Sequence, residues 1–197
     1  ALSSAASDVY KRQVYNMIWI IVGIVVILVL FIIVTYNSLI SLRNKKDDQW
    51  SQIEVQLKRR ADLIPNLVET VKGYAKHENN TLKEVIEARN TYVAASTPEE
   101  EMKASGEVTK ALNKLFALSE SYPDLKANEN FMALQKDLKD TEDKISYARQ
   151  FYNDTVLTYN NKVEMVPSNI VAGIFKFKKA TFFEASEEDK KTPEVKF

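Results

Sequence analysis

The sequence predicts an all-α protein in which one transmembrane helix continues into an up-and-down four-helix bundle with long first and last helices. Three observations support this prediction. Residues 17–36 form an apolar run without a charged side chain. After this run, apolar residues recur every three or four positions, which is the spacing of one helix face. Only four glycines and five prolines occur in 197 residues, which argues against a loop-rich or all-β fold.

The apolar run, MIWIIVGIVVILVLFIIVTY, has the length and composition of a membrane span. At about 1.5 Å per residue, a helix of this length covers roughly 30 Å, the thickness of the hydrocarbon layer. Its fifteen Ile, Val, Leu and Phe residues favour insertion by very roughly 5 to 9 kcal/mol. A buried core helix or strand is the alternative, but a single strand would have unpaired edges. The run is longer than the apolar region of a cleaved signal peptide, so we expect it to remain as an anchor.

We predict that residues 1–16 are a non-native tail, with Met17 as the true start. Asp8 to Gln13 resembles the translation of an adapter used in sequencing libraries. An uninterrupted genomic reading frame through Ala1 would contradict this hypothesis.

The basic residues around the span predict its orientation. Arg43, Lys45 and Lys46 follow the span, whereas only Lys11 and Arg12 precede it. The positive-inside rule therefore places the following domain in the cytoplasm, with a short N-terminus outside.

Composition excludes several function classes. The 27 basic and 27 acidic residues cancel, so no strong field attracts nucleic acid. The absence of cysteine removes thiol catalysis and thiolate metal sites. A single histidine, His77, cannot supply the paired Glu-x-x-His motifs of a di-iron bundle. The sequence has no G-x-S-x-G or H-E-x-x-H motif. We therefore expect no catalytic residue, cofactor or metal.

Residues 37–166 form the predicted bundle, and their first helix continues directly from the span. Pro65 is expected to stop or kink this helix because proline lacks an N–H and disfavours helical geometry at the residue before it. Asp62 would then cap a following helix. Around residues 77–80 either a break occurs or one helix continues, and Thr81 with Glu84 has the pattern of a capping box.

The second half of the bundle begins at a clear helix start. Thr97 supplies a capping hydroxyl, Pro98 fits the first turn, and acidic residues follow. This helix is predicted to run to Pro123, and Asp124 opens the last and longest one, whose apolar stripe continues to Val163. A long homomeric coiled coil is the alternative. Pro65, Pro98 and Pro123 divide the chain into segments of comparable length, which favours a chain that folds back on itself.

Residues 167–197 begin with a short apolar segment and end in a charged tail. One interpretation is a short helix and an extended tail that closes one end of the bundle. The other is an aromatic and basic segment that touches lipid headgroups or a partner. The residues concerned are Phe175, Phe177, Lys178, Lys179, Phe182 and Phe183.

Long strings of this sequence resemble the LemA family of bacterial membrane proteins. They are QLKRRADLIPNLV (56–68), VKGYAKHE (71–78), SYPDLKANENF (121–131), YARQFYN (147–153) and PSNIVA (167–172). The resemblance implies a single-pass protein of the bacterial inner membrane that carries a helical bundle and has no established enzyme activity. It suggests an HtpX-type metallopeptidase or a TPM-domain protein as a partner, beside the lipid bilayer that the apolar run predicts and a second copy of the chain. Lys176 departs from the pattern, since glycine is expected there more often.

Several residues of these strings are polar or helix-breaking on otherwise apolar helix stripes. We interpret them as residues that fix the register of the bundle, chiefly through hydrogen bonds and ion pairs between helices. A polar patch for a partner protein is the alternative. The candidates are Arg59, Arg60, Asp62, Pro65, Asn66, Asn128, Asn130, Arg149 and Asn153.

These observations favour a membrane-tethered helical scaffold that binds other envelope proteins or itself. One rival hypothesis is a hydrolase that works through carboxylates or a metal in a cleft of the bundle. The other is a signalling rod that relays motion along the first helix.

Overall fold

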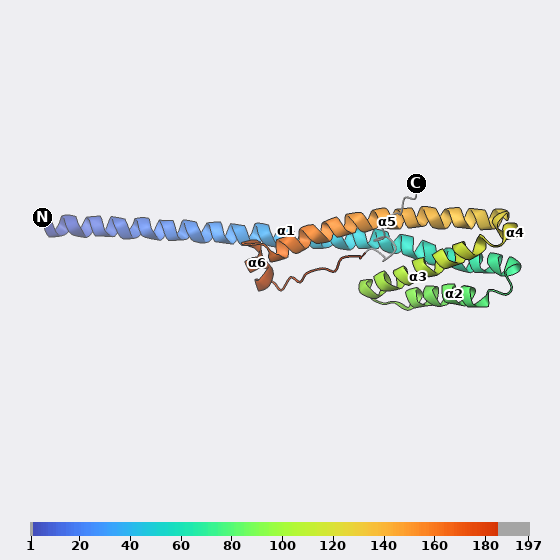
Figure 1. Cartoon of the computed structure of the whole chain (residues 1–197). Coiled ribbons are helices and arrows are strands. Elements are labelled where there is room, and N and C mark those ends of the chain that lie inside the picture. Colours follow the sequence, from blue (N-terminus) through green and yellow to red (C-terminus); the bar gives the residue numbers. More distant parts are fainter. Residues whose placement is uncertain (1, 185–197) are drawn as a thin grey trace, which may run out of the picture. The chain divides into compact units, whose positions relative to one another are not determined.

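The computed structural model describes residues 2–184, all of whose regular elements are helices (Figure 1). The helices are α1 (Leu2–Tyr74), α2 (Asn79–Ala94), α3 (Pro98–Ser119), α4 (Pro123–Lys126), α5 (Glu129–Glu164) and α6 (Ser168–Ile174). The prediction of an all-α protein with one long apolar N-terminal helix is confirmed. The chain divides into two compact units. Among the described residues, 2–44 and 158–179 form one, here called the anchor unit, and 45–157 with 180–184 form the other, here called the helical domain.

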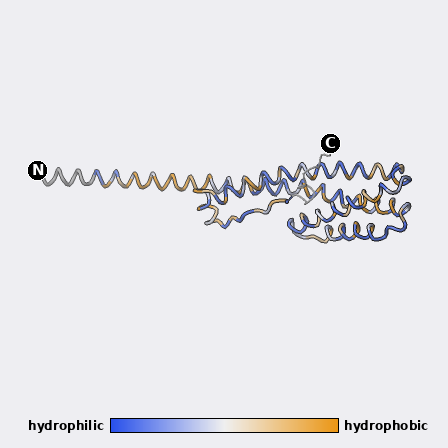
Figure 2. The backbone as a smooth tube through the Cα atoms, in the orientation of Figure 1, coloured by the Kyte–Doolittle hydropathy of each residue, from blue (hydrophilic) through white to orange (hydrophobic). Residues whose placement is uncertain are grey.

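In the anchor unit, α1 is long and apolar enough to cross a membrane (Figure 2). None of the apolar window in this helix is buried inside the protein. The first buried side chain that the structure describes on α1 is Thr35, and Leu39 is the next. Protein contacts therefore begin where the apolar run of the sequence ends.

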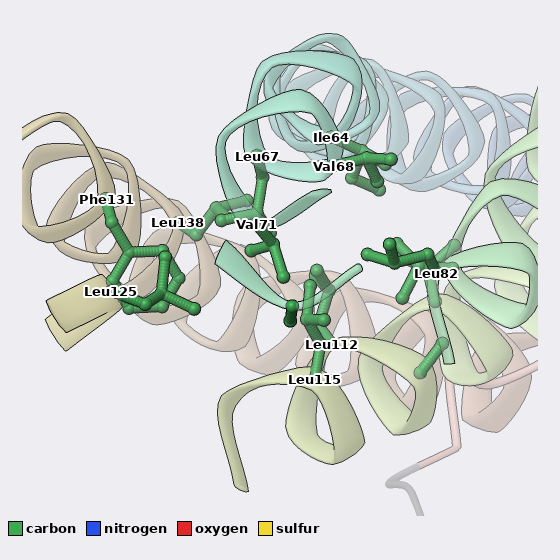
Figure 3. Close-up of a cluster of buried hydrophobic side chains, with 14 residues drawn as sticks. Ile64, Leu67, Val68, Val71, Leu82, Leu112, Leu115, Leu125, Phe131 and Leu138 are labelled. Carbon is green, nitrogen blue, oxygen red and sulfur yellow. The ribbon is translucent and has the colours of Figure 1, made fainter. Parts of the chain in front are cut away.

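The helical domain has one main apolar core, to which α1, α2, α3, α4 and α5 all contribute (Figure 3). Each fully buried Leu, Ile or Phe stabilises the fold by about 1.5–3 kcal/mol relative to an exposed one. The exact four-helix, up-and-down arrangement stays a prediction. The core residues are Ile64, Leu67, Val68, Val71, Ala75, Leu82, Val85, Val108, Ala111, Leu112, Leu115, Leu125, Phe131 and Leu138.

Pro65 does not stop the first helix, because α1 continues through it to Tyr74. Of the two predicted outcomes, the kink stays a prediction. Asp62 consequently lies inside α1 and caps no new helix. Proline removes the N–H that would bond the carbonyl four residues earlier, that of Ala61. The Nε of Arg89 on α2 donates to this carbonyl at 3.1 Å instead. Burial of α1 side chains on both sides of Pro65 then outweighs the remaining cost of the proline.

Because Arg89 supplies the hydrogen bond that the N–H of residue 65 would otherwise make, the effects of mutating Arg89 and Pro65 on stability should be coupled. Arg89→Ala in the full chain is expected to lower the free energy of unfolding by about 1–3 kcal/mol, since it removes the charged donor to Ala61. In a Pro65→Ala background the same change should cost less, because residue 65 can then donate its own N–H. Chemical denaturation of the four variants in detergent micelles measures the coupling. Equal losses in both backgrounds would contradict this account of the helix.

The first two interhelical connections agree with the sequence in part. A break does occur between Tyr74 and Asn79, but the predicted capping box at Thr81 is wrong. Glu78 occupies the N-cap of α2 without a side-chain cap bond, and Thr81 is buried in the first turn, because the helix begins earlier than predicted. The predicted start at Thr97 is confirmed. Its Oγ1 accepts from the backbone N–H of Glu100, and the Glu100 carboxylate accepts from the backbone N–H of Thr97.

The prediction that Asp124 opens the longest remaining helix is wrong. Asp124 belongs to the short helix α4, and α5 begins at Glu129. The reason is a cap: the Oδ1 of Asn128 accepts from the N–H of Phe131 at 2.9 Å. Asparagine is among the best N-cap residues, so it starts a new helix here. Its Nδ2 also donates to the Tyr74 hydroxyl at 3.0 Å, which joins the start of α5 to the end of α1.

Candidate functional site

Arg60 is a buried side chain of the helical domain that forms hydrogen bonds with two other helices. It projects from α1 and is only 2% exposed. Its Nη1 donates to the Thr109 Oγ1 at 2.9 Å and to the Glu142 carboxylate at 2.5 Å. Its Nη2 donates to the Ser105 hydroxyl at 2.8 Å and to the Ser105 carbonyl at 3.0 Å. One guanidinium therefore joins α1 to both α3 and α5.

The arrangement around Arg60 suits positioning rather than proton transfer. A buried charge costs several kcal/mol unless it is paired and hydrogen-bonded, and here four acceptors surround it. A guanidinium offers five N–H donors in a fixed planar arrangement and no acceptor, which suits it to orienting several helices at once. The sequence analysis missed its partners on α3. The sequence signal that could have identified these partners is a pair of small polar residues one helical turn apart, Ser105 and Thr109, beside the apolar stripe of α3.

The structure does not bring the other α1 candidates into this network. Arg59, Asp62, Pro65 and Asn66 are all exposed. On α5, Asn130 is likewise exposed, whereas Asn128 serves as the helix cap described above. Among the candidates on α1, Arg60 is thus the one that lies in the buried network.

Asn153 binds the segment that follows α6 instead of another helix. We call residues 180–184 the tail strap. The Oδ1 of Asn153 accepts from the N–H of Phe183 at 2.8 Å, and its Nδ2 donates to the Phe183 carbonyl at 2.9 Å. The neighbouring Tyr152 hydroxyl donates to the Thr181 carbonyl at 3.0 Å. Side chains of α5 therefore hold the strap by its backbone.

Phe183 fixes the tail strap on the helical domain through its ring. It is buried in a second apolar cluster with Ile53, Leu57 and Tyr152. The Arg149 guanidinium lies 5.9 Å from the centre of this ring. Phe183 thus packs inside the domain rather than projecting toward lipid, whereas Phe182 is exposed. A short helix followed by an extended segment agrees with the first interpretation, whereas its closing one end of the bundle stays a prediction.

The other half of the predicted aromatic and basic segment belongs to the anchor unit. The Phe175 ring lies 4.7 Å from that of Tyr36, and the Phe177 ring lies 5.8 Å from it. The Lys178 carbonyl accepts a hydrogen bond from the Tyr159 hydroxyl at 2.9 Å. The Lys179 ammonium pairs with Glu164 at 2.9 Å.

A cluster of acids and a tyrosine lies near the start of α3. Burial, followed by the charges of Glu101 and Glu54, raises the pKa of Tyr92 to about 12. Burial and the charge of Glu54 likewise raise the pKa of Glu101, one of whose oxygens is buried without a hydrogen-bond partner. Among the residues that the structure describes, no group of three or more His, Cys, Asp or Glu side chains is placed to hold a metal ion.

Glu101→Gln is expected to stabilise the protein at neutral pH. A carboxyl whose pKa is raised by folding holds its proton more tightly in the folded state, so its contribution to stability is lost as the pH rises through that pKa. The glutamine variant should therefore be more stable than the wild type at pH 7, with the difference vanishing below the ordinary carboxyl pKa. Thermal melts across this pH range test it. Glu99→Gln, an exposed change in the same helical turn, is the control, and equal behaviour of the two would contradict the prediction.

An exposed aromatic pair on α5 is the most conspicuous surface feature of the helical domain. Tyr147 is 66% exposed and Phe151 is 54% exposed, and their ring centres are 5.8 Å apart. Exposed aromatic side chains of this kind are enriched at the energetic centres of protein interfaces. The sequence analysis missed the pair, although two aromatic residues one turn apart beside the buried stripe of α5 were the available signal.

Comparison with known proteins gives a consistent result. The sequence model of the LemA family matches residues 49–197. Magnetosome proteins MamQ 1 and MamQ 2 of Paramagnetospirillum magneticum are each 26% identical over 200 residues, which cover 88% of this chain and 74% of the relative. Protein LemA of Metamycoplasma hominis is 28% identical over 155 residues, which cover 77% of this chain and 69% of the relative.

Proposed function

The chain belongs to the LemA family, and from this premise we propose that it is a membrane-anchored, non-catalytic scaffold of the bacterial envelope. The continuity of α1 supports the proposal. The same helix contains the apolar span and, further along, the buried core residues Ile53, Leu57 and Ile64. The apolar span and part of the core of the helical domain are therefore supplied by one helix.

The exposed pair Tyr147 and Phe151 is the observation that carries a binding function. Leaving two large aromatic rings in water gives up the free energy of burying them, and a partner surface would recover it. Tethering both proteins to one bilayer raises their effective concentration, so a small patch suffices. We take the partner to be an integral membrane protein of the same bilayer. The family resemblance suggests an HtpX-type metallopeptidase or a TPM-domain protein as candidates.

We also propose on which side of the membrane the helical domain lies. Arg43, Lys45 and Lys46 come directly after the apolar run. The positive-inside rule then favours an inner-membrane protein whose helical domain lies in the cytoplasm.

Site-specific crosslinking in native membranes tests the proposed function. Full-length protein carrying a photoreactive amino acid at Phe151 is expected to form discrete adducts with a membrane protein, identified by mass spectrometry. The same probe at Ile86, another exposed apolar residue of the helical domain, should not form them. The double variant Tyr147→Ala, Phe151→Ala should lose the partner while its thermal midpoint stays unchanged. Adducts at Phe151 no stronger than at Ile86 would contradict the proposal, and adducts between two copies would make the partner the protein itself.

The rival function is a hydrolase, for which the carboxylates of Glu54 and Glu101 are the candidates. Activity screens of the full chain, with and without divalent metals, separate the two. Turnover that Glu101→Gln abolishes would replace the scaffold proposal.

A further inference from the structure

The short helix α6 has apolar residues on both of its faces. Its inner face, with Ser168, Val171 and Ala172, is buried. On the outer face, Ile170 is 61% exposed and Ile174 is 62% exposed. A helix that faces water on one side normally carries polar residues there. The outer face of α6 therefore lacks the composition of a surface in contact with water.

The apolar exposure extends beyond the helix at both ends. Met165 and Val166 precede α6 and are exposed, and so is Phe175, which follows it. These residues and the two isoleucines lie within eleven consecutive positions of the anchor unit, and we call these five exposed apolar residues the α6 patch. Large contiguous apolar patches on a protein surface mark contacts with another protein or with a membrane.

The position of α6 on α1 decides between these occupants. The Phe175 ring contacts that of Tyr36, which is the last residue of the apolar run. The large apolar side chains of the run up to Val34 are almost all exposed, and the first buried residue is Thr35. α6 therefore lies against α1 at the level where a bare membrane span first acquires protein cover. On the N-terminal side of this level, lipid surrounds the span.

Basic residues lie on the side of the α6 patch away from the span. The Arg43 guanidinium is 5.7 Å from the centre of the Phe177 ring, and Lys176 and Lys178 are exposed close by in the sequence. Arg43 is seven residues past Tyr36, which is roughly 10 Å along a helix and places it just beyond a headgroup layer that is roughly 5–8 Å deep on each side of the hydrocarbon. The order is thus apolar span, apolar patch, then cations, as in segments that lie in a membrane interface.

We propose that α6 is a second membrane contact. Its outer face and the flanking residues Val166 and Phe175 lie at the boundary between acyl chains and headgroups, in the leaflet that contains the C-terminal end of the span. The proposal rests on the membrane anchoring that is part of the proposed function. A protein with a single span can rotate about the axis of the span and can tilt away from the bilayer normal. A second contact at the surface restrains both motions in the anchor unit.

The absence of cysteine from this chain makes the test direct. Single cysteines replace Ile170 or Ile174 in the full-length protein, which is spin-labelled and reconstituted into vesicles of phosphatidylcholine and phosphatidylglycerol. Collisions of the label with oxygen, which concentrates in lipid, are compared with collisions with a water-soluble nickel chelate. Val25→Cys reports the span, and Met132→Cys, an exposed apolar position of the helical domain, reports water.

The ratio of oxygen to nickel collisions at Ile170 and Ile174 is expected to be several-fold higher than at Met132 and lower than at Val25. A ratio equal to that at Met132, with Val25 in lipid, would overturn the α6 contact and leave the anchor intact. Low collision rates with both reagents would mean that protein covers the α6 patch, and would overturn it as well. A water-like ratio at Val25 would instead refute the anchoring on which the proposal rests.

Discussion

Arg60→Ala is expected to lower the free energy of unfolding of the helical domain by about 3–5 kcal/mol. The change removes the guanidinium that bonds α1 to both α3 and α5 in the buried network. It also leaves the Ser105 hydroxyl and the Thr109 hydroxyl without their buried donor and opens a cavity where the arginine stem packed. Domains are stable by only about 5–15 kcal/mol in total, so a loss of this size is a large part of the whole.

Two further variants make this prediction specific. Arg59→Ala changes the adjacent, exposed arginine and should alter stability by no more than about 0.5 kcal/mol. Arg60→Met keeps most of the side-chain volume and should cost less than Arg60→Ala. Denaturant titrations of the full chain in detergent micelles, followed by circular dichroism, measure all three. Similar stabilities for the Arg60→Ala and Arg59→Ala variants would show that the buried network does not hold the helices together.

The second large effect is expected in the span. Ile24→Arg together with Leu28→Arg places two charges one turn apart near the middle of the apolar run. Each change costs about 3–4 kcal/mol of insertion free energy, so the pair cancels most of the very roughly 5 to 9 kcal/mol that the run supplies. The variant should therefore appear in the soluble fraction after carbonate extraction, whereas the wild type stays in the membrane pellet.

A control with preserved composition separates charge from local sequence. Ile24→Leu with Leu28→Ile keeps the hydrophobicity of the run unchanged and should behave as the wild type. If the double-arginine variant also remained in the pellet, the run would not be what holds this protein in the membrane.

Features that depend on neighbouring residues were predictable from the sequence. The apolar run, the three-four spacing that buries Ile53, Leu57 and Ile64, and the cap at Thr97 are each set within a few helical turns. Local physical chemistry decides them, because length, periodicity and the first hydrogen bonds of a helix do not require a distant partner.

The errors concern bonds between residues that are far apart in the chain. Pro65 does not end α1 partly because Arg89, on another helix, supplies the missing donor. Asn153 was expected to bond between helices, yet it binds the backbone of Phe183, thirty residues further on. Polar side chains such as these have several satisfactory partners, and only the packed structure selects among them. The Arg60 network shows the same limit, since the arginine was a candidate while its acceptors on α3 were not.

Cysteine accessibility in native membranes tests the account of an anchored helical domain most directly, because the chain has no cysteine of its own. Single cysteines replace Val25 in the span and Asp140, an exposed residue of α5, and react with a membrane-impermeant maleimide. We predict that Asp140→Cys reacts only after the cells are lysed and that Val25→Cys stays unreactive until detergent dissolves the membrane. Reaction of Val25→Cys as fast as Asp140→Cys in native membranes would contradict the anchor, and reaction of Asp140→Cys on intact cells would contradict the cytoplasmic placement of the domain.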